Sequence, residues 1–501
     1  MEGHDAAIAI IAANIREYFD RQQPFRIYHG STNSTRQSKY RRDNIVDTST
    51  LINVLCVDKE KKTVLVEPNV PMDKLVEETI QHGLVPPVVM EFPGITVGGG
   101  FSGTSGESSS FRHGMFDRTV NWIEMVIPNG EKVTASPTDR ADLFWGTASA
   151  CGTLGVVTLL EVQLMEAKKY VQLTYYLASS IQEAIRKIEE ATDDISNDYL
   201  DGIIFAKDQI VICSGRLTND LPEGASIQRF TRAQDPWFYI HTEKRVVNAI
   251  DLVVDYVPLA DYLFRYDRGA FWVGKYSFAY FMAPFNRVTR YLLDGFLHTR
   301  MMYHGLHQSG LSKEYIIQDV AVPYQASDEF LSWLHGNFGH YPLWLCPLRR
   351  QATDSPFDLL ADDSNDGKDE YLLSFGVWGP GPKRHREIVD RNRELEQKVQ
   401  ELRGKKWLYA NTYYTEEEFW SIYSRKKYDA LRERYHAAHL PTVYDKVNVD
   451  VDAEEQVICT SQKAWLRALF WSIWPLRGLY GVFRIWMGGD YLIQGKKQKK
   501  N

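Results

Sequence analysis

Apolar and polar residues follow two different spacings along this chain. Before residue 167, short β-branched runs alternate with charged turns, as in VLCVDKEKKTVLVEP (54–68), and Pro-Asn-Gly at 128–130 joins two alternating runs. Such alternation predicts antiparallel hairpins. From about residue 168, longer segments such as IQEAIRKIEEATDDI (181–195) have helical spacing, and Tyr, Trp and Phe become frequent. These two residue patterns predict an α+β fold with at least two domains.

Length, charge and cysteine content narrow the class of protein. A chain of 501 residues with 44% hydrophobic residues can bury the cores of two or three domains. The net charge of −7 argues against nucleic-acid binding, which needs a basic surface. The five cysteines are scattered without a Cys-x-x-Cys pair, so we expect no metal site, no disulfide framework and a cytosol-facing compartment. The apolar run at 6–13 predicts the first turns of an amphipathic helix.

Residues 91–114 read EFPGITVGGGFSGTSGESSSFRHG and predict a phosphate-binding loop. Glycines let backbone N–H groups approach an anion closely. Gly98 to Gly103 match the dinucleotide pattern G-x-G-x-x-G, and Glu124 follows about twenty residues later. A Rossmann unit would open a helix at these glycines, whereas we expect a loop that continues into a hairpin. A nucleotide-triphosphate loop would end in Gly-Lys-Ser/Thr, which is absent here. We therefore expect a phosphate contact of another type.

Two further segments share this character, IYHGSTNSTR (27–36) and CGTLGVVT (151–158). Together the three resemble the flavin-binding domain of the vanillyl-alcohol oxidase (PCMH) type. The resemblance implies non-covalently bound FAD, with two loops around the diphosphate and a Gly-x-x-Gly-Val strand along the flavin. The implied FAD-binding residues are Gly30, Ser31, Thr32, Asn33 and Ser34 in the first segment; Thr96, Val97, Gly98, Gly99, Gly100, Phe101, Ser102, Gly103, Thr104, Ser105, Gly106, Glu107, Ser108 and Ser109 in the second; and Cys151, Gly152, Gly155, Val156 and Val157 in the third.

A closer resemblance is to the Δ24-sterol reductase family, also called diminuto or seladin. TVGGGFSGTSGESSSFRHGMFD (96–117), YPLWLCP (341–347), LYANTYYTEEEFW (408–420) and PTVYDKV (441–447) carry it. The resemblance extends from about residue 25 to about residue 450, and it implies reduction of a sterol side-chain double bond with NADPH as reductant, through FAD. The implied domains are an FAD-binding domain at 1–166, a substrate domain at 167–404 with a mainly antiparallel sheet, a segment at 405–455 that returns to the active site, and a tail at 456–501.

The implied reaction needs a proton donor, because an unpolarised alkene accepts hydride poorly unless an acid protonates it. On a strand, Tyr409, Asn411 and Tyr413 would share one face, so we expect them to line the active site. The alternative is a core strand with structural tyrosines. Glu370 and Asp319 are further candidate acids, and a solvated strand end or a buried ion pair would explain them equally.

Histidines offer two other chemistries. Some flavin enzymes attach the cofactor through histidine, and His29 and His113 lie beside the two loops. Because the resembled family binds FAD without a covalent bond, we expect these side chains to form hydrogen bonds in the loops. His304 and His307 have metal-like spacing without a matching carboxylate pattern, so we interpret them as part of a surface helix.

The carboxyl-terminal segment 465–493 is rich in Trp, Phe and Leu and is interrupted by arginines and a proline. It has no uninterrupted stretch of roughly 20 apolar residues, so we expect it to lie at a membrane surface. The alternative is a helix packed on the protein itself or on a partner. Because the family's amino-terminal membrane segment is missing, we expect the tail to replace it and to hold the protein on the cytosolic side of the endoplasmic reticulum membrane. The final residues KQKKN (497–501) resemble a dilysine retrieval signal.

Two other functions fit the same features. A flavin oxidase acting on an alcohol or another lipid would share the fold and pass electrons to oxygen. A sterol-binding or scaffolding protein would keep the fold without turnover. Dependence on NADPH separates the reductase from both.

Overall fold

The computed structural model describes residues 2–30, 44–247, 253–351, 355, 357, 371–449, 470–471 and 473–487. Within these residues the chain forms two large antiparallel sheets, two small two-stranded sheets and helices around them, so the predicted α+β class is confirmed. Glu370, the first-loop residues Ser31, Thr32, Asn33 and Ser34, and most of the tail beyond 456 lie outside the described residues.

A five-stranded sheet organises the amino-terminal part, and its order is β3-β4-β8-β6-β7. The predicted hairpins are confirmed, since β3 pairs with β4 and β6 with β7, both antiparallel. The strands are β3 (Val54–Asp58), β4 (Thr63–Val66), β6 (Val120–Val126), β7 (Lys132–Ala135) and β8 (Val156–Gln163). Two small sheets add β1 (Arg26–Tyr28) to β2 (Ile45–Asp47) and β5 (Leu84–Val85) to β9 (Met165–Glu166).

Helices in this part follow the predicted apolar spacing. Helix α1 (Glu2–Asp20) contains the run at 6–13 and buries Ile8, Ile11 and Ile15, as expected for an amphipathic helix. The other helices are α2 (Met72–Ile80), α3 (Val97–Ser102), α4 (Ser110–His113), the 3₁₀ turn η1 (Phe116–Thr119) and α5 (Ala141–Thr147).

An eight-stranded antiparallel sheet forms the second part, in the order β13-β10-β12-β11-β15-β16-β14-β17. Successive residues face opposite sides, so Tyr199 packs with the amino-terminal core while Leu200 packs with helices on the other face. The strands are β10 (Tyr170–Ala178), β11 (Tyr199–Ala206), β12 (Gln209–Thr218), β13 (Val253–Pro258), β14 (Tyr315–Pro323), β15 (Leu343–Arg349), β16 (Tyr371–Pro380) and β17 (Lys405–Lys406).

Two groups of helices cover this sheet. One face carries helices with residues in a separate core cluster: α6 (Ile181–Asp193), α12 (Ser327–Asn337) and α13 (His385–Glu401). The remaining helices of this part are α7 (Phe238–Val247), α8 (Leu259–Leu263), α9 (Gly274–Tyr280), α10 (Arg287–Leu292) and α11 (Thr299–Ser309), with the 3₁₀ turns η2 (Asp294–Phe296), η3 (Leu311–Glu314) and η4 (Tyr324–Ala326).

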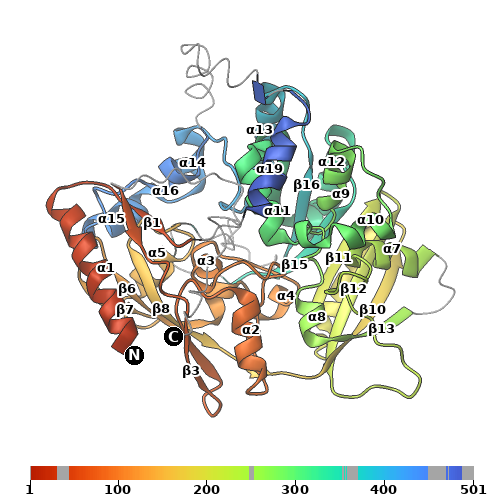
Figure 1. Cartoon of the computed structure of the whole chain (residues 1–501), viewed down its shortest axis with the longest axis horizontal. Coiled ribbons are helices and arrows are strands. Elements are labelled where there is room, and N and C mark those ends of the chain that lie inside the picture. The colour runs from red at the N-terminus through yellow and green to blue at the C-terminus, as the bar shows by residue number, and fades with distance from the viewer. Residues whose placement is uncertain are drawn as a thin grey trace.

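The chain then returns to the amino-terminal part, as Figure 1 shows for α14 (Glu416–Ile422), α15 (Arg425–Arg434) and α16 (Val443–Val447). The Tyr428 hydroxyl on α15 donates to Thr153 Oγ1 at 2.7 Å. A capping box at Thr415 begins α14, and the chain breaks at Tyr423 and restarts as α15 with a Ser424 cap.

Helix α19 (Leu476–Trp486) is the described part of the tail, and it packs along α11 (Figure 1). The helices approach closely because Gly305 and Gly481 face each other: a Cβ on Gly481 would lie 2.9 Å from the Gly305 carbonyl oxygen. Among the described residues, no helix is both long and apolar enough to cross a membrane.

Candidate active site

The glycine-rich stretch is a short helix rather than the continuous loop we expected. Thr96 caps α3 by accepting a hydrogen bond from the Gly99 amide at 3.1 Å. The predicted absence of a Rossmann unit still agrees with the geometry, because no strand lies between β5 and β6 in this fully described stretch. The glycines therefore do not follow the strand that a Rossmann unit requires.

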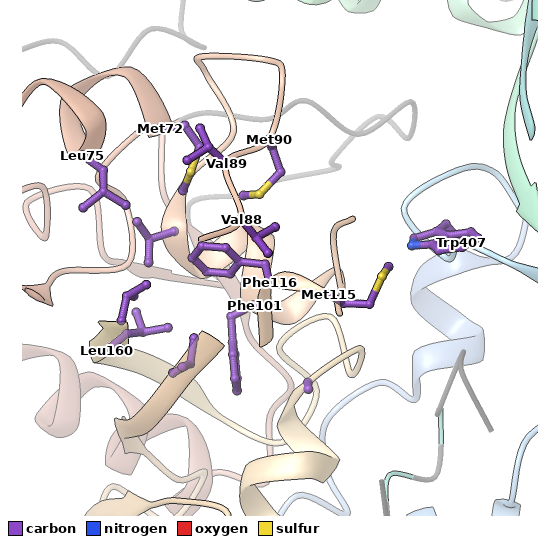
Figure 2. Packing of buried hydrophobic residues seen from close by; sticks show 14 of the residues in the cluster. Met72, Leu75, Val88, Val89, Met90, Phe101, Met115, Phe116, Leu160 and Trp407 are labelled. Carbon is purple, nitrogen blue, oxygen red and sulfur yellow. The ribbon is translucent and has the colours of Figure 1, made fainter. Parts of the chain in front are cut away.

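One side of α3 belongs to the core. Figure 2 shows Phe101 and Phe116 among buried apolar side chains that include Val88 and Met90. A Cβ on Gly100 would lie 2.4 Å from the Met90 methyl carbon, so only glycine fits this contact without a shift. Val97, Gly100 and Phe101, which we expected to contact the cofactor, instead serve packing because α3 buries that side.

Four polar residues expected at the cofactor also bond elsewhere. The Thr104 hydroxyl pairs with Ser149, and the Thr104 carbonyl accepts from the Trp407 indole N–H at 3.0 Å. The Glu107 carboxyl accepts hydrogen bonds from the Ser108 and Ser109 hydroxyls. These side chains do not line the cavity described next, because they tie the loop to its neighbours.

A cavity of about 770 Å³ brings the three predicted segments together. This volume is in the range of small-molecule sites. Its lining includes His29 from the first segment, Thr96, Gly98, Gly99, Ser102, Gly103, Ser105 and Gly106 from the second, and Cys151, Gly152, Gly155, Val156 and Val157 from the third. Gly30 has a left-handed φ of 74° and does not line the cavity.

The polar end of the cavity fits a phosphate-bearing cofactor. Ser102 and Ser105 line this end, and the buried His29 Nδ1 has no hydrogen-bond partner in the described part of the chain. Burial and, to a smaller extent, the charge of Lys446 lower the pKa of His29 to about 4, so the ring is neutral at pH 7. Lys446 Nζ donates to the Cys151 carbonyl at 2.7 Å and supplies a positive charge to this end.

In the third segment (151–158), the backbone adopts conformations that favour glycine at two positions. Gly155 has φ of 141°, and a Cβ there would lie 2.7 Å from the Val126 carbonyl oxygen. Gly152 has φ of 71°, and a Cβ there would lie 2.6 Å from the Ile27 side chain. Both positions therefore favour glycine, because φ is positive and an added Cβ would be crowded.

The other end of the cavity is aromatic and apolar. Phe271, Trp344 and Trp378 lie together, with ring centroids 4.4 Å apart for Phe271 and Trp378 and 6.0 Å apart for the two tryptophans. Tyr303 and Leu306 of α11 and several residues of α19 complete the lining. Such walls fit a flat apolar molecule.

A carboxyl group with a raised pKa lies in this aromatic end. Tyr409 Oη donates to Asp319 Oδ2 at 2.7 Å, while the buried Oδ1 has no hydrogen-bond partner among the described residues. Burial raises the pKa of Asp319 to about 7, and the bond from Tyr409 only partly opposes this effect. Because its pKa is about 7, Asp319 can hold and release a proton near neutral pH. Asp319 and Tyr409 both line the cavity.

The strand expected over residues 408–413 is wrong. Strand β17 ends at Lys406, and the chain then turns, so Tyr409, Asn411 and Tyr413 do not share a face. Tyr409 alone lines the cavity. The Asn411 carbonyl accepts from Lys406 Nζ at 2.7 Å, and the Tyr413 amide donates to Glu396 at 3.0 Å. A buried pair of Lys406 with Glu396 thus organises the turn, which alternating sequence spacing does not reveal.

Glu91 is a second carboxyl that sequence reasoning missed. It is buried, lines the cavity, and its Oε1 has no hydrogen-bond partner among the described residues. Burial, with a contribution from Glu107, raises the pKa of Glu91 well above its usual range and so favours the neutral form of this side chain. The only feature of the sequence that could have indicated a role for Glu91 is its place at the start of the glycine-rich segment 91–114, two residues before Pro93.

The other histidines take no part in this cavity. His113 does not line it. The surface helix expected at His304 and His307 is wrong, because both side chains are buried on α11, along which α19 packs. Among the described residues, no group of three or more metal-ligating side chains gathers anywhere.

Comparison with known proteins agrees with this geometry. Residues 7–136 match the family model described as FAD binding domain. The fold and the site define an FAD-dependent oxidoreductase, and the predicted FAD cofactor is confirmed.

Comparison with curated relatives indicates a narrower class of enzyme than the match to the FAD binding domain does. The chain is 28% identical over 456 residues to the Delta(24)-sterol reductase of Homo sapiens, covering 89% of this chain and 86% of the relative. It is also 28% identical to the Delta(24)-sterol reductase of Arabidopsis thaliana, covering 82% and 78%. Cytokinin dehydrogenase 9 of Oryza sativa subsp. japonica matches over only 163 residues, at 29% identity, covering 32% and 27%. The resemblance stated from the sequence is therefore confirmed.

Proposed function

We propose that this protein reduces the Δ24 side-chain double bond of a sterol, with FAD as cofactor and NADPH as reductant. The observation that carries the proposal is a single cavity with a glycine-rich polar end, an aromatic end, and Asp319 at the aromatic end with a pKa of about 7. The similarity to Delta(24)-sterol reductases over most of both chains supports the choice of substrate.

In this proposal the polar end holds FAD. The Ser102 and Ser105 hydroxyls and the Gly106 backbone meet the diphosphate, His29 accepts or donates one hydrogen bond, and Lys446 supplies a positive charge. The domain at 1–166, together with the segment at 405–455, would form this end, and the domain at 167–404 the substrate end. Reduced FAD, when bound, supplies a hydride to one alkene carbon, after reduction by NADPH.

Asp319 supplies the proton in this proposal. Because Tyr409 donates to Oδ2, the acidic proton resides on Oδ1, the oxygen without another partner in the described structure. Oδ1 protonates the less substituted alkene carbon, so positive charge develops on the more substituted carbon. Faces of Trp378 and Phe271 stabilise that charge by about 0.5–2 kcal/mol each when water is excluded. Tyr409 then stabilises the carboxylate that remains.

We also propose that the tail holds the protein on the cytosolic face of the endoplasmic reticulum membrane. Leu479, Phe483 and Trp486 of α19 are 51%, 49% and 74% exposed, which supports contact with a lipid interface. In a vesicle flotation assay, Phe483→Ser/Trp486→Ser should reduce the bound fraction. Unchanged flotation would contradict attachment through the tail.

An anaerobic spectral titration tests the reductase. The purified protein should show a flavin spectrum, lose it on addition of NADPH, and regain it on addition of a sterol with a side-chain double bond, while the saturated sterol has no effect. A flavin that NADPH leaves oxidised and that an alcohol substrate reduces would indicate the oxidase. Sterol binding without bleaching by NADPH would indicate a non-catalytic relative.

A further inference from the structure

Most of the large apolar side chains exposed in the described structure lie in two stretches far apart in sequence. One is the segment around α10, which we call the α10 segment (282–293), and the other is the described tail from residue 470. The exposed residues are Met282, Val288, Tyr291, Leu292 and Leu293 in the first, and Phe470, Ile473, Trp474, Leu479, Val482, Phe483, Trp486 and Met487 in the second. A soluble protein surface rarely gathers this much apolar area without a partner.

Both stretches contribute residues to the cavity lining. Leu293, Leu479 and Val482 line it and are also 39%, 51% and 36% exposed, so they form its rim. The Trp474 indole N–H donates to the Tyr280 carbonyl at 2.8 Å, two residues before the α10 segment begins. Helix α19 is therefore at once a wall of the cavity and a neighbour of the α10 segment.

Charge indicates which partner fits this surface. Helices α10 and α19 carry Arg287, Arg290, Arg477 and Arg484 and no Asp or Glu. Arg477 is paired with Glu314, so the positive charge offered to a partner comes from the other arginines, although the whole chain has a net charge of −7. Two copies of such a surface would bring arginines together. A lipid bilayer with anionic headgroups offers negative charge at the level of the arginines and apolar chains beneath it.

We propose that the α10 segment and α19 form one membrane-binding surface, and that the apolar substrate enters the cavity from the bilayer across the rim at Leu293, Leu479 and Val482. The substrate part rests on the proposed function, whereas lipid binding by the α10 segment can be tested without any turnover. An apolar substrate then reaches the aromatic end without passing through water. Passage through water would cost free energy, because the apolar surface of the substrate would be exposed to solvent.

A vesicle flotation assay on the full chain tests the surface, with phosphatidylcholine vesicles containing a minor fraction of phosphatidylserine. The test variant is Val288→Asp/Leu292→Asp, since both side chains are exposed and neither lines the cavity. The matched control is Ile195→Asp, at a residue that is 86% exposed and outside both stretches. We expect the partition coefficient to fall roughly tenfold or more in the test variant, with the flavin spectrum kept, and to stay unchanged in the control.

Three results would overturn the proposal. The first is equal flotation of the test variant and the unchanged protein, because the intact tail alone would then explain binding. The second is a halved mass of the test variant in light scattering, which would assign the surface to a second copy of the chain. The third is an equal increase in the KM of the test variant for sterol presented in vesicles and for sterol presented in detergent micelles. Entry from the bilayer predicts an increase in KM only for sterol in vesicles. Absence of sterol turnover would refute the proposed function while the flotation result still decides the surface.

Discussion

Replacing the proposed acid, as Asp319→Asn, tests the centre of the mechanism. Asparagine keeps the size of the side chain and can still accept the Tyr409 hydrogen bond, but it has no acidic proton. General acid catalysis contributes about 10²–10⁴-fold to a rate. We therefore expect the sterol-dependent reoxidation of the flavin to slow by about that factor, while reduction by NADPH and the flavin content stay unchanged.

The same substitution has a calculable effect on stability. The pKa of Asp319 is about 7 in the fold against 3.8 ordinarily. Between these values the unfolded chain binds fewer protons than the folded one, so stability falls as the pH rises from about 4 to about 7. A shift of about three units corresponds to about 4 kcal/mol lost above pH 7. Asp319→Asn should abolish this pH-dependent loss.

Two measurements check these expectations. Stopped-flow spectroscopy should show that reoxidation by sterol slows above pH 7 in the unchanged enzyme, because the acid loses its proton there. Denaturant unfolding at pH 5 and pH 8 should show a smaller pH dependence for the variant. Reoxidation by Asp319→Asn at the normal rate, or with the normal pH profile, would refute the assignment of Asp319 as the proton donor.

Three further outcomes are expected. Tyr409→Phe removes a bond that lowers the pKa of Asp319, so the fall in reoxidation rate should move to higher pH; an unchanged pH profile would contradict the pairing. Gly152→Ala should lose bound flavin, measured by absorbance, whereas Gly83→Ala, also at positive φ but with nothing near its Cβ, should lose only stability; equal flavin content would contradict the cavity assignment. Lys406→Met should cost about 3–5 kcal/mol in unfolding, because it leaves a buried carboxyl group unpaired, and a smaller loss would mean water enters there.

Sequence reasoning succeeded where a structure depends on neighbours along the chain. The hairpins around residues 54–66 and 120–135 and the buried stripe of α1 were predicted correctly. Alternation of apolar and polar residues in strands and helical spacing of apolar residues are patterns within one element, so they can be recognised in the sequence without knowledge of tertiary contacts. The similarity of three distant segments to a flavin domain was enough to identify the cofactor.

Sequence reasoning failed where the position of a side chain depends on a distant element. The turn after β17 depends on the buried pair of Lys406 and Glu396, so a strand was predicted where none exists. His304 was expected at the surface because nothing near it in sequence indicates that α19 packs along its helix. Among the loop residues, Gly100 packs against Met90 and Phe116, and Thr104 and Glu107 form hydrogen bonds with neighbouring side chains, so these residues do not line the cavity.

The sequence by itself thus determined the fold class, the FAD cofactor and the family resemblance, because these reside in local patterns and in short motifs. Tertiary structure alone decided that Asp319 lies beside Tyr409 with a raised pKa, that Lys446 reaches Cys151, and that α19 lines the cavity. The physical reason is that burial and proximity between residues far apart in the chain arise only when the sheets and helices pack together.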